Sequence, residues 1–205
     1  MERKIFKPDG TNPLIVYKIE AAKPEGAKNI MIYGHLDKQP YEEPWDEGLH
    51  PTKPVIRDGR LFGRGASDDG YAVFSTMLAV KVAQMQGKPL PRICMVLESE
   101  EESGSENLPM LLDVSRDYVG KPDCLFCMDS GVLDYKQLWV TSSLRGVALV
   151  DLKVECGKGG YHSGEVGGIV PETFRVVRTL LDRLDDTATG RVVDDFQPTI
   201  PDWKV

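Results

Sequence analysis

Strand-like and helix-like segments alternate along residues 14–128 of this 205-residue chain. Four segments are short, apolar and rich in β-branched or aromatic side chains, as strands are: residues 14–19, 29–33, 92–97 and 124–128. Residues 70–86 carry apolar side chains at helical spacing before Gly87, and residues 108–114 predict a shorter helix. This alternation predicts an α/β fold, in which flanking helices cover a mostly parallel sheet. Residues 55–62 predict a separate hairpin that turns at Asp58-Gly59.

The pattern changes near Leu138, which predicts a second domain. Residues 147–155 end in alternating apolar and polar side chains, typical of a strand with one buried face. A helix is expected from about Pro171, with the proline in its first turn and one apolar face. We therefore expect an α/β domain over residues 1–140 and the beginning of a smaller α+β domain over residues 141–205. One strand and one helix are too little for an independent core.

Composition narrows the classes of function. A net charge of −7 argues against a nucleic-acid-binding surface, which needs a basic patch. No apolar run reaches the roughly 18 residues of a membrane span, so no membrane partner is expected. The first ten residues lack the apolar centre of a signal peptide, and a cytoplasmic location is expected. Cys124 and Cys127 form a lone C-x-x-C, which we interpret as part of a buried strand rather than a zinc ribbon.

Metal-binding residue types follow the predicted strands. His35 and Asp37 come after residues 29–33, Glu101 and Glu102 after residues 92–97, and Asp129 after residues 124–128. In parallel sheets, ligands collect beyond the carboxyl ends of the strands, so these side chains are expected to meet at one edge. An imidazole with several carboxylates indicates a two-metal hydrolase.

Such a centre needs several distinct carboxylates. One bridges the two ions, and another, bound to neither, moves a proton between the attacking water and the leaving amine. Adjacent glutamates suit this division, because successive side chains diverge. Asp37 is placed to fix the tautomer of His35.

The motifs around these residues resemble the M20 dizinc metallopeptidases, most closely the carnosinase-like dipeptidases. The motifs are Tyr33-Gly34-His35-Leu36-Asp37, Gly63-Arg64-Gly65-Ala66-Ser67-Asp68-Asp69, Glu100-Glu101-Glu102-Ser103-Gly104 and Asp129, in family order over nearly the whole chain. The resemblance implies that His35 and Asp129 are terminal ligands of one zinc and that Asp68 bridges both ions. It makes Glu102 a ligand of the second zinc, Glu101 the general base and acid, and Asp37 the partner of the histidine.

The resemblance extends into the second domain. Tyr161-His162-Ser163-Gly164-Glu165 looks like the substrate-binding loop of the family's lid, in which the histidine polarises the scissile carbonyl, usually from the partner subunit of a dimer. It implies a small peptide substrate, two divalent ions that are zinc or manganese, and a homodimer formed through the lid. The family's second zinc also takes a histidine from much later in a longer chain, and neither His50 nor His162 matches that position. We therefore expect a truncated fragment.

Plainer interpretations stay open. A lone His-x-Asp is usually a hydrogen-bonded loop, the run Glu98 to Glu106 could be a solvated acidic face, and His162 could simply be exposed. Within that run, Glu98 and Glu100 are expected to surround the ligands or to be exposed. Two alternative functions remain: hydrolysis of N-acyl amino acids by the same amide chemistry, and a catalytically silent fragment that binds a metal or a partner.

Overall fold

The computed structural model describes residues 1–41 and 44–204. The chain divides into two compact units, Met1–Ser142 and Ser143–Val205. The first unit is built on a five-stranded sheet with the order β1-β2-β6-β3-β7. Its strands are β1 (Glu2–Phe6), β2 (Leu14–Ile19), β3 (Asn29–His35), β6 (Arg92–Glu98) and β7 (Cys124–Cys127). The strands β6, β3 and β7 are parallel, whereas β1 and β2 pair antiparallel at the other edge. The predicted α/β class is confirmed.

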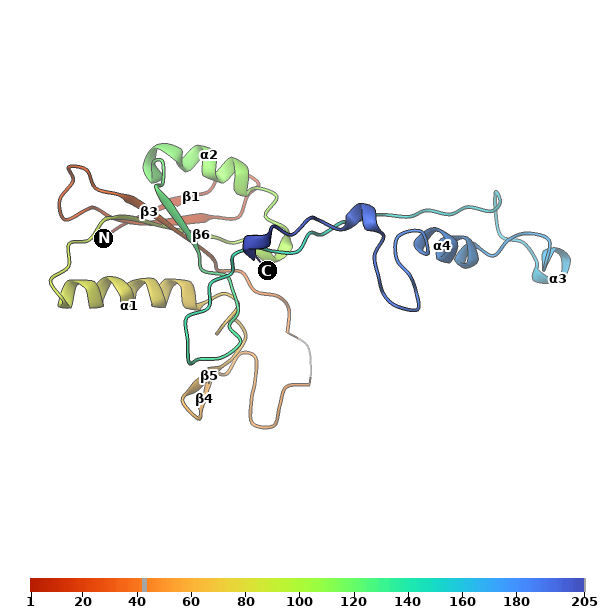
Figure 1. Ribbon diagram of the computed structural model, residues 1–205, viewed down its shortest axis with the longest axis horizontal. Coiled ribbons are helices and arrows are strands. Elements are labelled where there is room, and N and C mark those ends of the chain that lie inside the picture. The colour runs from red at the N-terminus through yellow and green to blue at the C-terminus, as the bar shows by residue number, and fades with distance from the viewer. Residues whose placement is uncertain (42–43, 205) are drawn as a thin grey trace. The chain divides into compact units, whose positions relative to one another are not determined.

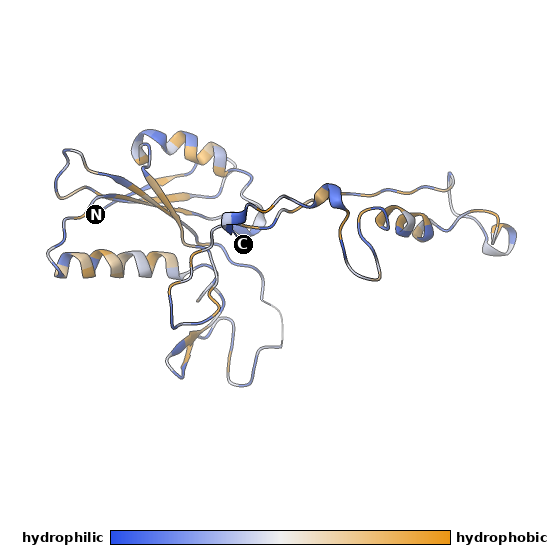
Figure 2. Ribbon diagram, in the orientation of Figure 1, coloured by the Kyte–Doolittle hydropathy of each residue, from blue (hydrophilic) through white to orange (hydrophobic). Residues whose placement is uncertain are grey.

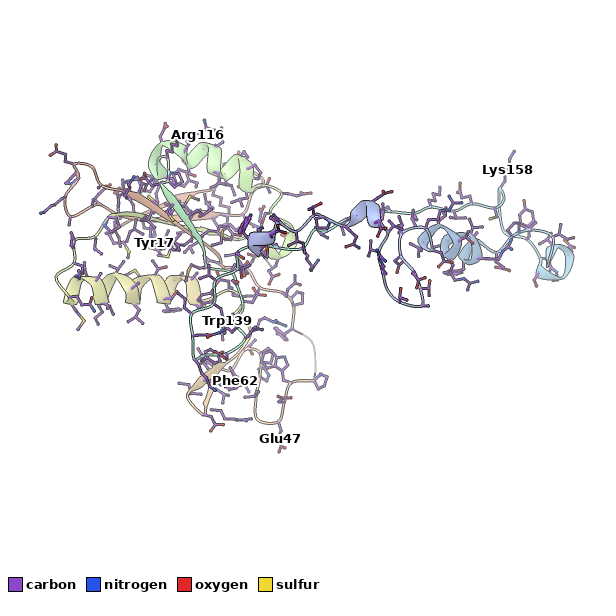
Figure 3. The ribbon with its side chains drawn as sticks, in the orientation of Figure 1. Tyr17, Glu47, Phe62, Arg116, Trp139 and Lys158 are labelled. Atoms are coloured by element: carbon purple, nitrogen blue, oxygen red, sulfur yellow. The ribbon has the colours of Figure 1, made fainter. Side chains whose placement is uncertain are left out.

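Two helices cover opposite faces of this sheet (Figure 1). Helix α1 (Tyr71–Met85) lies against β3, and α2 (Leu108–Val119) lies against β1 and β2. Both helices were predicted, although α2 continues five residues past the predicted end at Val114. Figure 3 shows Arg116 on the outer side of α2, where its guanidinium pairs with Asp113. The hairpin of β4 (Val55–Arg57) and β5 (Arg60–Phe62) turns at Asp58-Gly59, as predicted.

The core of the first unit lies between the sheet and α2. It consists of apolar side chains that are at most a few per cent exposed: Leu14, Val16, Cys94, Val96, Leu111 and Val119. Figure 2 shows the hydrophobic colour concentrated on the central strands. Strand β6 is buried along nearly its whole length, because it has neighbours on both sides.

Strand β7 corrects one expectation about burial. All four of its residues are exposed, including Cys124 and Cys127, which were expected to be buried. The strand pairs with β3 alone and lies at the edge of the described sheet. The described helices α1 and α2 pack against β1, β2 and β3, which leaves the side chains of β7 accessible.

The second unit contains the helices α3 (Ser163–Val166) and α4 (Thr173–Leu181), and the short turns η2 (Asp194–Phe196) and η3 (Asp202–Lys204). The predicted helix is present, but Pro171 precedes its N-cap Glu172 instead of lying in its first turn. The expected strand over residues 147–155 is wrong, since these residues have no regular structure. A strand needs a hydrogen-bonded neighbour, and the described residues of this unit provide none for it.

None of the helices in the described part of the chain is long and apolar enough to cross a membrane.

Candidate metal centre

The carboxyl ends of three parallel strands bring the predicted ligands together. His35 is the last residue of β3 and pairs in register with Glu98, the last residue of β6. The backbone N–H of Met128, just after β7, donates to the carbonyl of Tyr33 at 2.8 Å. Asp129 therefore follows at the same edge of the sheet. The placement expected from the strand order is the one observed.

The imidazole of His35 is the centre of the cluster. It is 1% exposed, and its Nε2 lies 3.0 Å from Asp68 Oδ1, 3.8 Å from Asp129 Oδ2 and 3.9 Å from Glu101 Oε2. These carboxylates come from three segments that are distant in the sequence. Burial acts to lower the pKa of His35, but the hydrogen bond to Asp37 and the surrounding carboxylates outweigh it, so the pKa is raised.

Hydrogen bonding at the other ring nitrogen fixes the tautomer of this histidine. Nδ1 lies 2.9 Å from the carbonyl oxygen of Asp37. A carbonyl oxygen can only accept, so Nδ1 carries the hydrogen. In the neutral ring, Nε2 then presents its lone pair toward the three carboxylates, which is the state that a metal ion requires.

The carboxylate of Asp37 has a second role beyond its 3.4 Å approach to Nδ1 of His35. Its two oxygens accept hydrogen bonds from the backbone N–H groups of Glu101 (3.2 Å) and Glu102 (2.9 Å). Those two residues open the short turn η1 (Glu101–Ser103). Asp37 therefore positions the two glutamates as well as the histidine.

Asp68 and Asp69 separate into an exposed and a buried carboxylate. Asp68 points toward His35, whereas Asp69 is fully buried and accepts hydrogen bonds from the backbone N–H groups of His35 (3.1 Å) and Ala72 (3.3 Å). Burial raises the pKa of Asp69, and these two hydrogen bonds oppose the rise. Asp69 thus joins the end of β3 to the first turn of α1, a role that the sequence analysis missed.

Glu101 and Glu102 have different surroundings. Burial raises the pKa of Glu101; His35 opposes this rise, and the charges of Asp129, Glu102 and Asp68 add to it. Glu102 Oε2 accepts a hydrogen bond of 2.8 Å from the side-chain amide of Gln39. Gln39 was also missed, although its place two residues after Asp37 puts it on the same loop.

Gln39 also lines a cavity of about 640 Å³, together with Phe62 of β5. The residues that line it come from 38–41, 51–52, 54 and 61–66, and most of these residues are apolar.

Two groups of these side chains could each hold a metal ion. The first contains His35, Asp68 and Asp129, and the second contains His35, Glu101 and Glu102. Within each group, the candidate ligand atoms lie within 4.8 Å of one another. The two groups share His35, the only histidine that either contains within the described residues. One ion can therefore take an imidazole ligand, and a second would depend on carboxylates here.

His162 lies in the second unit and is described with it. Its ring caps α3, because Nδ1 accepts a hydrogen bond of 3.1 Å from the backbone N–H of Gly164. In the neutral ring, Nε2 then carries the hydrogen and is a donor. The side chain is exposed.

Comparison with known proteins agrees with this arrangement of residues. The family model described as peptidase family M20/M25/M40 matches residues 31–193, which include every candidate residue named above. This chain belongs to that peptidase family.

Two relatives with established names are similar over much of the chain. It is 36% identical over 149 residues to the Cys-Gly metallodipeptidase dug1 of Schizosaccharomyces pombe, which covers 71% of this chain and 31% of the relative. It is 31% identical over 189 residues to the Beta-Ala-His dipeptidase of Rattus norvegicus, which covers 88% of this chain and 38% of the relative. The M20 chain thus spans about a third of the length of these relatives.

A solved structure supports the fold. An M20 family metallo-carboxypeptidase from Sulfolobus solfataricus superposes with a TM-score of 0.66 at 21% identity, over 97% of this chain and 45% of that one.

Proposed function

We propose that this chain is part of a metal-dependent peptidase that hydrolyses dipeptides or other short peptides, with Glu101 as the general base and acid. The observation that carries the proposal is the convergence of Asp68, Glu101 and Asp129 on Nε2 of one buried histidine. The printed names of the two relatives, a Cys-Gly metallodipeptidase and a Beta-Ala-His dipeptidase, support a dipeptide as substrate.

The residues present fit a divalent ion. The hydrogen bond from Nδ1 of His35 to a carbonyl leaves Nε2 available, and carboxylate oxygens complete a ligand set that zinc and manganese both accept. His35 and Asp129 would hold one ion, Asp68 would bridge to a second, and Glu102 would bind the second. Bound ions of this kind polarise a carbonyl group and lower the pKa of a water molecule. The second ion has no histidine of its own among the described residues, so we propose that its site is incomplete in this chain.

Glu101 suits proton transfer. Its raised pKa makes the carboxylate a better proton acceptor than an ordinary glutamate at neutral pH. It would accept the proton of the attacking water and return it to the departing amine. Glu102, one residue on, is held by Gln39 and would remain a ligand.

His162 would bind the substrate carbonyl. Because its Nδ1 caps α3, the hydrogen on Nε2 is free to donate to a carbonyl oxygen that gains negative charge. We assign residues 141–205 to the beginning of a lid domain, and residues 1–140 to the metal-binding catalytic domain.

We also propose that the lid forms a homodimer. The apolar side chains of Val147, Leu149, Val150 and Leu152 are exposed on a segment with strand-like alternation. Such a segment can pair with a strand of another chain. Sedimentation of the purified protein tests this: a monomer at micromolar concentration would contradict it.

A cytoplasmic location is part of the same proposal. The four cysteines are unpaired, and two of them are exposed, which suits a reducing compartment.

The experiment that tests the function compares Glu101→Gln with wild type, in the longest form of the protein that its gene encodes. Zinc content, dipeptide hydrolysis and hydrolysis of an N-acetyl amino acid are measured for each. The proposal expects Glu101→Gln to retain zinc and to lose at least about a hundredfold in dipeptide hydrolysis. Glu106→Gln, at an exposed position in the same acidic run, is the matched control and should behave as wild type.

Three outcomes would change the conclusion. If Glu101→Gln still hydrolyses dipeptides, Glu101 is not the general base. A preference for the N-acetyl amino acid identifies an amidohydrolase. A wild-type protein that binds zinc but hydrolyses neither compound is a silent metal-binding protein.

A further inference from the structure

Glu98 is a buried carboxylate that the proposed chemistry does not use. It is 1% exposed and ends β6, directly beside His35 in the parallel register. Its Oε1 accepts hydrogen bonds from the hydroxyl groups of Tyr33 and Ser105, the latter at 3.1 Å. Its Oε2 is buried and has no hydrogen-bond partner among residues 1–41 and 44–204.

The buried carboxylate of Glu98 lowers the stability of the fold, and it occupies a position in β6 where an apolar side chain would continue the buried apolar run. The preceding residues of the strand, Met95, Val96 and Leu97, are all apolar and buried. A buried carboxylate oxygen without a partner lowers the stability of the folded state. Packing therefore does not explain why this residue is acidic, and its hydrogen bonds to Tyr33 and Ser105 indicate another role.

Ser105 ends the turn that carries Glu101 and Glu102. Gly104 has φ +100° and Ser105 has φ +54°, so the chain passes through two left-handed residues as it leaves the turn. Serine adopts this conformation infrequently, and here its backbone N–H donates to the carbonyl of Glu100 at 2.8 Å. The bond from the Ser105 hydroxyl to Glu98 fastens this end of the turn to the sheet.

Tyr33 provides the other connection. It lies on β3, two residues before His35, so the two side chains are on the same face of the sheet. Hydrogen bonds to Glu98 thus connect Ser105, which follows the turn η1, to β3, the strand that carries His35. Asp37 ties the entrance of the turn to the same strand end.

We propose that Glu98 is a positioning residue. By accepting hydrogen bonds from Ser105 and Tyr33, it holds Glu101 and Glu102 in a fixed position relative to His35. The chemical roles of Glu101 and Glu102 rest on the proposed function. The positioning itself is a property of the metal-free chain and can be measured there.

Amide hydrogen exchange of the metal-free chain is the first test. All five N–H groups from Glu101 to Ser105 donate hydrogen bonds, so their exchange reports how firmly the turn is held. Ser105→Ala and Tyr33→Phe each remove one donor to Glu98, and each should speed exchange of these amides about tenfold. Ser103→Ala is the matched control: it removes a hydroxyl of the same turn that donates to the Glu100 carbonyl and not to Glu98, and it should leave the other amides unchanged.

Exchange in β6 separates a local effect from a global one. The proposal expects the amides of β6 to exchange in Ser105→Ala as they do in wild type. It is overturned if the turn exchanges at the wild-type rate in both variants, or if β6 accelerates as much as the turn.

Zinc affinity of the chain is the second test. Glu98→Gln should bind zinc nearly as well as wild type, because its amide oxygen can accept both hydrogen bonds. Glu98→Leu removes both and should weaken zinc binding about tenfold, as the loss of residues that orient metal ligands does. Equal zinc affinity and equal turn exchange in Glu98→Leu and wild type would overturn the proposal. Should Glu98→Leu not fold, Ser105→Ala decides.

The two proposals fail in different ways. If the wild-type chain binds no zinc, the metal-dependent function is contradicted for this chain, and the exchange measurements still decide the role of Glu98.

Discussion

The carboxylate of Asp37 accepts a hydrogen bond of 2.9 Å from the backbone N–H of Glu102, which lies 65 residues later in the sequence. The same carboxylate accepts the N–H of Glu101, and the carbonyl of Asp37 accepts from His35. Asp37, two residues beyond the end of β3, therefore sets both the orientation of His35 and the start of the turn η1. Side chains that orient metal ligands in this way matter almost as much as the ligands.

Replacement of Asp37 by alanine is predicted to weaken zinc binding by about 10- to 100-fold, because the turn loses its anchor and His35 loses a neighbouring charge. A competition titration with a chromophoric chelator measures this. Asp113→Ala, on the exposed side of α2, is the control and should bind zinc as wild type does. Wild-type affinity in Asp37→Ala would show that the turn is held without it.

Gly34→Ala is predicted to destabilise the first unit by about 1–3 kcal/mol, the usual effect of overpacking. A Cβ at Gly34 would lie 2.6 Å from Ala72 Cβ and 2.6 Å from Asp69 Oδ2, so β3 and α1 would have to separate. Urea unfolding followed by circular dichroism measures the change. Gly131→Ala is the matched control, since a Cβ there meets no atom within 4 Å; equal stability of the two variants would contradict this account.

Much of the first unit could be predicted because local signals and tertiary context agree there. Strand β6 is apolar and β-branched, and its place between two strands buries it. Strand β1 was not predicted, because Glu2, Arg3 and Lys4 give it no apolar alternation; pairing with β2 makes it a strand. Residues 147–155 show the reverse case, in which strand-like alternation has no described partner and forms no strand.

The candidate site divides in the same way. The rule that ligands gather at the carboxyl ends of parallel strands predicted from the sequence that His35, Glu101 and Asp129 lie close together. The hydrogen-bonding roles of Asp69 and Gln39 could not be inferred, because the sequence does not tell which of two adjacent carboxylates turns inward. Burial of Asp69 against Ala72 and the backbone of His35 decides that.

Leu111→Ala is predicted to cost about 2–5 kcal/mol of unfolding free energy, because it leaves a cavity between α2 and the sheet. Leu111 is 2% exposed and belongs to the core cluster. Leu133→Ala, at a position that is 84% exposed, is the control and should change stability little. A similar loss in both variants would mean that α2 does not cover the core as described.

Asp123 predicts how stability falls in acid. Its carboxylate accepts hydrogen bonds from the backbone N–H of Asn29 (2.8 Å) and the ammonium of Lys28 (2.9 Å), which hold the pKa of Asp123 below its usual value of 3.8. A carboxyl group with a lowered pKa in the folded state contributes stability above pH 3.8, and this contribution is lost as the pH falls through the folded-state pKa. Asp123→Asn should therefore be less stable than wild type at neutral pH, and the difference should shrink toward zero below pH 3.8.

Urea unfolding from about pH 7 to about pH 2.5 measures the dependence on Asp123. Asp117→Asn, at an exposed position on α2, is the control and should follow the wild-type curve. A difference between Asp123→Asn and wild type that stays constant with pH would assign the effect to lost hydrogen-bond geometry. A difference that closes in acid assigns it to the charge that ties the start of β3 to the start of β7.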